Sequence, residues 1–135
     1  MIETPTSELT STAEAIVRGT VKDMKSEWDE ERKFIWTLVT ISVSKSLKGD
    51  RLEQQDITVK IPGGIVGEIG QQTEDAPIFN KGEEVLLFLK SNVHKGQKVF
   101  HVRGNFQGKH TIKDNMIIEK KIPVDNFVGQ IKSAM

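Results

Sequence analysis

The sequence predicts a mainly β protein: a small closed or partly open Greek-key barrel with a short N-terminal helix and an amphipathic C-terminal helix. Three observations support this prediction. Apolar and polar residues alternate with the period of a half-buried strand in residues 15–24, 33–44 and 56–61. The second run is long for one strand, and such a strand can serve two sheets only by bending, as strands of small barrels do. Near the C-terminus, apolar residues recur at helical spacing instead.

The size and composition suit one globular domain. The chain has 135 residues, of which 36% are hydrophobic and 28% are charged, as is typical of a folded domain rather than a disordered chain. We expect a single domain over residues 1–135, with the barrel at about 13–120 and the C-terminal helix at about 124–134.

The absence of cysteine excludes disulfides and thiolate metal sites, so stability must come from the core. No apolar run approaches the roughly 20 residues that a membrane span needs. The start, MIETPTSELTSTAEA, is acidic and polar, unlike a secretory leader. These features fit a cytoplasmic chain and equally a mature exported domain, so composition leaves the compartment open.

The first elements follow from local patterns. PTSELTSTAEA, at residues 5–15, suits a short helix capped by Thr6 or Ser7. AIVRGTVKDM, at 15–24, alternates as a strand, and the charged KSEWDEER, at 25–32, suits a loop. FIWTLVTISVSKSL then forms the long second strand, with one face made of Ile35, Val39, Ile41 and Val43.

The later elements are shorter. LKGD, at residues 47–50, suits a turn, and DITVKI gives a third strand with Ile57, Val59 and Ile61 inward. KGEEVLLFLK contains the continuous apolar run 85–89 and predicts the most buried strand. KVFHVRGNFQGKHTI and NMIIEK predict further short strands with bends at glycines. The helical stripe at the C-terminus consists of Val124, Phe127, Val128 and Ile131.

This order of elements is typical of an OB-type barrel. The succession AEAIVRGTV, VTISVSKSLKGD, ITVKIPGG and APIFNKGEEVLLFLK resembles a widespread group of uncharacterised exported bacterial and archaeal proteins with an OB-like barrel. More distantly, it resembles the netrin module and the N-terminal domain of tissue inhibitors of metalloproteinases. The resemblance spans about residues 13–112, and the motifs that carry it are mainly structural.

The resemblance implies an extracytoplasmic location but no catalytic position. The metalloproteinase inhibitors place an N-terminal cysteine on the catalytic zinc, and this chain has no cysteine. Their inhibitory chemistry therefore does not carry over.

The glycine-rich stretch IPGGIVGEIGQ, at residues 61–71, raises the question of a phosphate site. Its glycines read Gly-Gly-x-x-Gly-x-x-Gly with no helical period behind them, which does not match a dinucleotide fingerprint. A P-loop needs Gly-Lys-Ser/Thr at its end, whereas Gly70 is followed by two glutamines. The stretch is therefore interpreted as part of a loop, residues 62–77, that joins two strands.

Two interpretations of this loop remain open. Its apolar residues can fold over the barrel mouth as a lid, or lie exposed as a contact surface. We favour the lid, with at least one of Ile65, Val66 and Ile69 buried and with residues 68–74 mobile. As a contact surface, the loop would act together with Trp28, an aromatic residue in a charged loop. The candidate contact residues are Trp28, Gly63, Gly64, Ile65, Val66, Gly67 and Ile69.

The other aromatic and imidazole side chains do not predict a site. Trp36 lies on the polar face of the second strand, where packing beneath a terminal helix is the simplest interpretation. His94, His101 and His110 lack recognisable ligand spacing, so we expect surface or rim histidines and no metal. The acidic loop at 27–31 lacks the pattern of a calcium loop.

These residues favour a non-enzymatic binding or interaction module for an unknown protein or small ligand, without a cofactor. No catalytic motif occurs, and Glu83 and Glu84 are adjacent in a strand, so their side chains should point to opposite faces. The alternative is a nucleic-acid-binding domain using residues 90–121, which hold 8 Lys and Arg against 2 Asp and Glu. That segment has few aromatics and the whole chain has no net charge, so nucleic acid is the less favoured partner.

Overall fold

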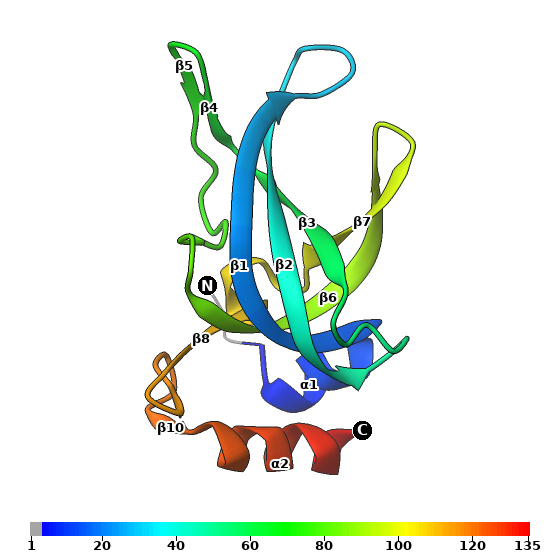
Figure 1. The fold of residues 1–135 in the computed structure, drawn as a ribbon, viewed down its shortest axis with the longest axis vertical. Helices are drawn as coiled ribbons and strands as arrows, with labels where there is room; N and C mark the ends of the chain where they lie inside the picture. The colour runs from blue at the N-terminus through cyan, green and yellow to red at the C-terminus, as the bar shows by residue number, and fades with distance from the viewer. Residues whose placement is uncertain (1–3) are drawn as a thin grey trace.

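The structure, a computed structural model, describes residues 4–135. Five strands close a ring in the order β1, β2, β3, β7, β6 and back to β1. Figure 1 shows this barrel rising from the two terminal helices at one end to three hairpins at the other. The ring strands are β1 (Ala15–Trp28), β2 (Ile35–Lys48), β3 (Asp56–Pro62), β6 (Glu84–His94) and β7 (Gln97–Val102).

The ring confirms the predicted mainly β fold with a small barrel. Its strand pairs are antiparallel except for β3 and β7, which run parallel and meet at Val59 and Phe100. Closure depends on β1, whose first six residues pair with β6 while the strand pairs with β2 from Ile16 to Trp28. Register shifts in β1, one of them between Arg18 and Gly19, accompany this double pairing and are typical of barrel strands that bend.

Short elements complete the sheet and cover one end. A small hairpin, β4 (Gly64–Val66) and β5 (Ile69–Gln71), follows β3. Beyond β7 comes the 3₁₀ helix η1 (Asn105–Gly108). The strands β8 (Lys109–Lys113), β9 (Met116–Ile117) and β10 (Ile122–Pro123) follow it and extend the sheet outward from β6. The helices are α1 (Thr6–Thr12) and α2 (Val124–Ala134), which contact each other beside β9 and β10.

Two apolar cores result. The barrel interior holds the inward faces of the ring strands, including the predicted Ile57, Val59 and Ile61. A second core lies between the helices and the outer side of the barrel, where Phe88 of β6 meets Phe127 of α2 with ring centroids 6.2 Å apart. The predicted C-terminal stripe is confirmed, because Val124, Phe127 and Ile131 are buried and Val128 is partly buried.

Within residues 4–135, every helix is too short or too polar to cross a membrane.

Candidate functional site

The segment predicted as an irregular loop contains the β4–β5 hairpin, which is fixed to the barrel by hydrogen bonds. Gly63 donates its backbone N–H to the carbonyl of Ile35 at 2.9 Å, and the Thr37 hydroxyl donates to the Gly63 carbonyl at 2.8 Å. The side-chain oxygen of Gln71 accepts the backbone N–H of Ile35 at 2.7 Å. The base of the hairpin is thus held on both sides by β2.

Glycine is required where this hairpin meets the barrel. Gly64 has φ 140°, and a Cβ placed there would lie 2.5 Å from the hydroxyl oxygens of Ser26 and Thr37. These two hydroxyls are hydrogen-bonded to each other at 2.9 Å. Gly63 also has a positive φ, 93°. Gly64 therefore allows the hairpin backbone to approach the Ser26 and Thr37 side chains closely.

The lid prediction for the hairpin residues is wrong. Ile65 is 70% exposed and Ile69 is 52% exposed, while Val66 is only half-buried. The strands of the hairpin pair with each other and project beyond the barrel, as Figure 1 shows, so their side chains do not reach the barrel interior. The contact-surface interpretation of these residues remains.

A different residue of this part of the chain packs into the barrel core. Phe79, just before β6, is 5% exposed and belongs to the barrel core, with Ala76 packed partly against that core. Lys109 places its ammonium 5.3 Å from the Phe79 ring centroid. The sequence analysis missed Phe79, although the short apolar island at residues 76–79 between polar stretches could have indicated it.

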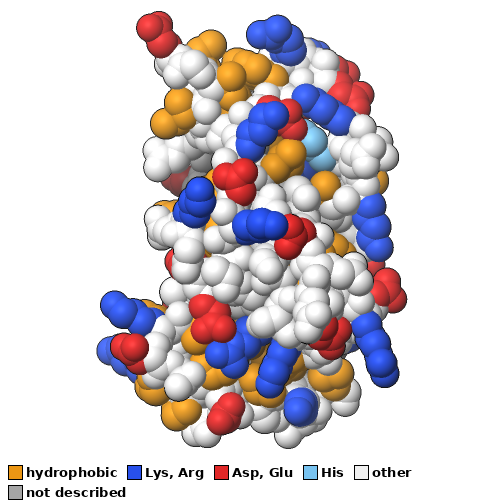
Figure 2. All heavy atoms as spheres, viewed as in Figure 1, with side chains coloured by type: hydrophobic (Ala, Val, Ile, Leu, Met, Phe, Trp, Pro, Cys, Tyr) orange, Lys and Arg blue, Asp and Glu red, His pale blue; other side chains and the backbone are white. Residues whose placement is uncertain are grey.

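A groove lies between the hairpin base, strands β2 and β3, and the segment that leads to Phe79. We call this cavity of about 710 Å³ the hairpin groove. Two exposed apolar side chains, Met24 and Ile78, line it, and Ile78 is 75% exposed. Figure 2 shows hydrophobic side chains gathered at the hairpin end of the molecule. The hairpin surface, as we use the term, consists of Met24, Ile65, Ile69 and Ile78.

The lining of the hairpin groove includes two of the predicted contact residues, Gly63 and Gly64. Gly67 turns the hairpin tip with φ 59°, away from the groove. The lining residues are Met24, Thr37, Val39, Ile61, Pro62, Gly63, Gly64, Gln71, Gln72, Thr73, Glu74, Asp75, Ala76, Pro77, Ile78 and Phe79.

Trp28 is not brought into this groove. It is the last residue of β1 rather than part of a charged loop, and it lies half-buried opposite Ile35 of β2. The strand continues past Met24, where the alternation ends, because β2 supplies pairing partners as far as Trp28.

The prediction that Trp36 packs beneath a terminal helix is also wrong, because the helices cover the other end of the barrel. Trp36 contacts Phe34 at a centroid distance of 4.9 Å, and the Lys60 ammonium lies 4.1 Å from its ring. Burial lowers the pKa of Lys60, which also donates to the Val93 carbonyl at 3.1 Å. Trp36, Lys60 and His101 are among the residues that line a smaller cavity of about 200 Å³.

Two histidines expected at the surface, His94 and His110, are buried. His94 is 5% exposed, and its Nε2 lies 3.0 Å from Glu27 Oε1. Burial raises the pKa of Glu27, but hydrogen bonds from Lys95 and His94 outweigh it and the net pKa is lowered. This cluster ties the β6–β7 hairpin to β1, because Lys95 also contacts Glu27 at 3.3 Å. His101 is partly buried, and burial lowers its pKa.

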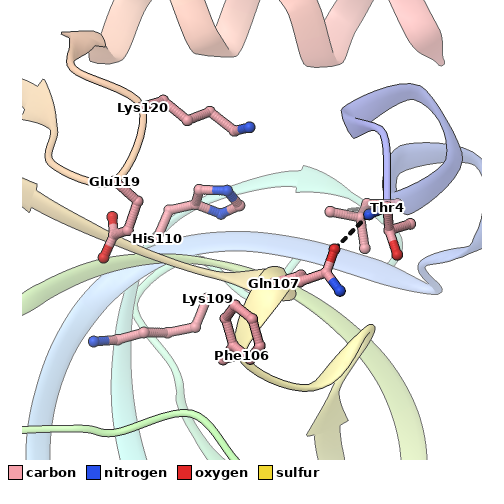
Figure 3. Close-up of a pocket in the computed structure, with 8 residues that line it drawn as sticks. Thr4, Phe106, Gln107, Lys109, His110, Glu119 and Lys120 are labelled. Atoms are coloured by element: carbon pink, nitrogen blue, oxygen red, sulfur yellow. Dashed lines mark hydrogen bonds between the residues drawn. The ribbon is translucent and has the colours of Figure 1, made fainter. Parts of the chain in front are cut away.

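His110 lines a third cavity, of about 250 Å³, beneath α2. Figure 3 shows its ring at the centre, with Glu119 and Lys120 on one side and Gln107, bonded to Thr4, on the other. The side chain is 3% exposed, lies 4.7 Å from the Phe127 centroid, and leaves Nδ1 without a hydrogen-bond partner. Burial lowers the pKa of His110 to about 4.

The polar groups around His110 are already engaged. Glu119 accepts both the backbone N–H and the hydroxyl of Thr111 at 2.7 Å, and Lys109 pairs with Glu83 at 3.0 Å. His110 is a neutral imidazole above pH about 4 and packs edge-on against Phe88. We therefore assign this cavity to the packing of α2 on the barrel.

No group of three or more acidic or imidazole side chains that could hold a metal occurs among residues 4–135. Glu83 and Glu84 contact different partners, as expected from their adjacency: Glu84 binds Arg18 at 2.8 Å, whereas Glu83 binds Lys109. They do not form a carboxylate pair.

Part of the basic charge of segment 90–121 is paired with acidic side chains. Lys95 and Lys109 are paired with Glu27 and Glu83 from the acidic part of the chain. Arg103 donates to the Thr12 hydroxyl at 3.0 Å. The charge asymmetry along the sequence is thus reduced in space, because strands distant in the chain are neighbours in the barrel.

Replacing the exposed isoleucines will test their solvation directly. Ile65→Asp and Ile69→Asp should each change the free energy of unfolding by no more than about 0.5 kcal/mol, because their side chains are in water already. Ile61→Asp, the matched control in the barrel core, should cost several kcal/mol. Urea unfolding measures all three, and a loss at Ile65 or Ile69 similar to that at Ile61 would restore the lid.

Comparison with protein-family models and with curated protein sequences found no match.

Proposed function

We propose that the protein is a non-enzymatic binding module and that the hairpin surface and hairpin groove are its contact site. The observation that carries this proposal is the exposure of Ile65 and Ile69, one on each face of a fixed hairpin, and of Ile78 at the groove beside it. Large apolar side chains gathered around a groove are typical of interaction sites, whereas single exposed hydrophobics are common on any surface.

The anchoring of the hairpin supports the same proposal. Hydrogen bonds from Ile35, Thr37 and Gln71 hold the base of β4 and β5 before any partner arrives. A preorganised surface loses less conformational entropy on binding than a flexible loop would. A partner that covers the isoleucines would gain the hydrophobic contribution of their burial.

The resemblance to exported OB-like proteins supports an extracytoplasmic setting as part of this proposal. Nucleic acid is the weaker candidate partner. A single-strand binder combines a positive groove with stacking aromatics, whereas the lining of the hairpin groove includes Glu74 and Asp75 and one aromatic, Phe79, which is buried in the core.

Peptide selection tests the proposed contact site. Random linear peptides displayed on phage are selected on the immobilised protein, and the recovered peptides are synthesised and titrated by fluorescence anisotropy. We expect the Ile65→Asp/Ile69→Asp variant to bind them about tenfold more weakly or worse, because a charge replaces each apolar contact.

The control is a double variant at two exposed aliphatic residues outside the hairpin surface, Val93→Asp/Ile118→Asp. It should bind the peptides as the wild type does. Recovery of no peptide, or equal weakening by both double variants, would contradict the proposal.

A further inference from the structure

We infer that the partner of the hairpin surface is a polypeptide segment that combines apolar side chains with at least one lysine or arginine. This inference rests on the proposed function and adds the chemical class of the ligand. It follows from the charges around the hairpin groove and from the arrangement of the apolar groups beside it.

The charged residues that line the groove, within the described part of the chain, are both acidic: Glu74 and Asp75. Glu68 adds a third carboxylate near the hairpin tip. The twenty residues 61–80 contain these three acids and no lysine or arginine. All three side chains are exposed to solvent.

These carboxylates have no basic partner of their own. Among residues 4–135, the ion pairs engage other acids: Lys22 binds Asp56, Lys33 binds Glu31, and Lys109 binds Glu83. Lys60 lies on the Trp36 face of the β2–β3 pair instead of the groove face. The groove therefore keeps a net negative charge that a cationic side chain would complement.

The shape of the site favours a chain segment over a small molecule. A small molecule in the hairpin groove would leave Ile65 and Ile69 exposed, because these residues do not line the cavity. A polypeptide segment can place one side chain in the groove while its neighbours extend along the hairpin, over Ile69 on one face or Ile65 on the other. Its cationic group would then lie beside Glu74 and Asp75, at the polar side of the groove.

The test repeats the peptide selection on a variant without these charges, Glu68→Gln/Glu74→Gln/Asp75→Asn. Asparagine is chosen at 75 because Asp75 has φ 64°, a conformation that asparagine tolerates. Peptides recovered on the wild type should be enriched in lysine and arginine relative to those recovered on the variant. Synthesised wild-type peptides should bind the variant about threefold to tenfold more weakly.

A second triple variant controls for net charge. Glu8→Gln/Glu53→Gln/Asp114→Asn removes the same number of charges from exposed positions elsewhere, and Asp114 also has a positive φ, 53°. It should retain wild-type affinity. Added salt should weaken wild-type binding and abolish the difference from the groove variant, because it screens exposed charges.

The outcomes separate the two proposals. Peptides that depend on Ile65 and Ile69 but show no basic enrichment and bind both triple variants equally would overturn the cationic partner and leave the contact site standing. Peptides insensitive to Ile65 and Ile69 would overturn both. A preference for acidic or neutral peptides, or for single-stranded oligonucleotide over every peptide, would likewise overturn this inference.

Discussion

Lowering the pH from 6.5 to about 4 should destabilise the protein by about 3 kcal/mol through His110 alone. Above pH 6.5 the imidazole is neutral in both the folded and the unfolded chain. Between pH 6.5 and 4 the unfolded chain takes up a proton while the buried His110 does not, so protonation favours unfolding. The contribution of His110 to the free energy of unfolding is therefore fully present above pH 6.5 and is lost as the pH falls to about 4.

The variant His110→Phe should remove this part of the pH dependence. Phenylalanine suits a site bordered by Phe88 and Phe127, and it eliminates the buried Nδ1 that has no hydrogen-bond partner. Urea unfolding at a series of pH values between 7.5 and 4 measures the effect. Wild type should lose stability steeply over this range, whereas His110→Phe should lose much less.

His101 provides the comparison, since burial also lowers its pKa but leaves it partly exposed. His101→Gln should retain most of the wild-type pH dependence. If His110→Phe and wild type lost stability in parallel, the large pKa shift of His110 would be refuted.

Gly64→Ala should destabilise the protein by about 2 kcal/mol or more and release the β4–β5 hairpin. An alanine would have to adopt φ 140°, which L-residues rarely do, at a cost of about 1–3 kcal/mol. Its Cβ would also lie 2.5 Å from the hydroxyl oxygens of Ser26 and Thr37 and would force their hydrogen bond apart. Thermal melts measure the loss, and amide hydrogen exchange in residues 64–71 measures the release.

Gly67→Ala is the matched control, because Gly67 lies in the same hairpin with φ 59° but no neighbouring heavy atom lies within 4 Å of its Cβ position. It should cost no more than about 1–2 kcal/mol and leave the hairpin base protected. Peptides selected on the wild type should bind Gly64→Ala weakly and Gly67→Ala normally. Equal melting temperatures for the two variants would show that close approach at Gly64 is unimportant.

Periodicity predicted the barrel because burial along a strand is a local property of sequence. The inward residues of DITVKI and the run at 85–89 are buried as expected, since each face of a strand meets one environment over its length. The prediction of the apolar stripe on the C-terminal helix was correct for the same reason, with helical spacing in place of strand alternation. Charged residues near the end of β1 interrupt the alternation of apolar and polar residues. The sequence pattern therefore placed Trp28 in a loop, although β1 pairs with β2 as far as Trp28.

The candidate site depended on information that the local pattern lacks. Gly63, Gly64 and Gly67 have positive φ, but no period in the sequence shows whether Ile65 or Phe79 turns inward. Which of these side chains is buried depends on the path of the chain after β3 and on the space available in the barrel core. Phe79 lies where the chain re-enters the barrel at β6, whereas Ile65 lies on strands that pair only with each other.

The sequence by itself determined the strands of the barrel, the helical stripe at the C-terminus and the absence of disulfides. Only the tertiary structure decided which apolar side chains of residues 62–79 are covered, which histidines are buried, and that Glu74 and Asp75 line a groove beside exposed isoleucines. The physical reason is that backbone period and composition act between neighbours in the chain. Burial in loops and charge pairing act between strands that the barrel brings together from distant parts of the sequence.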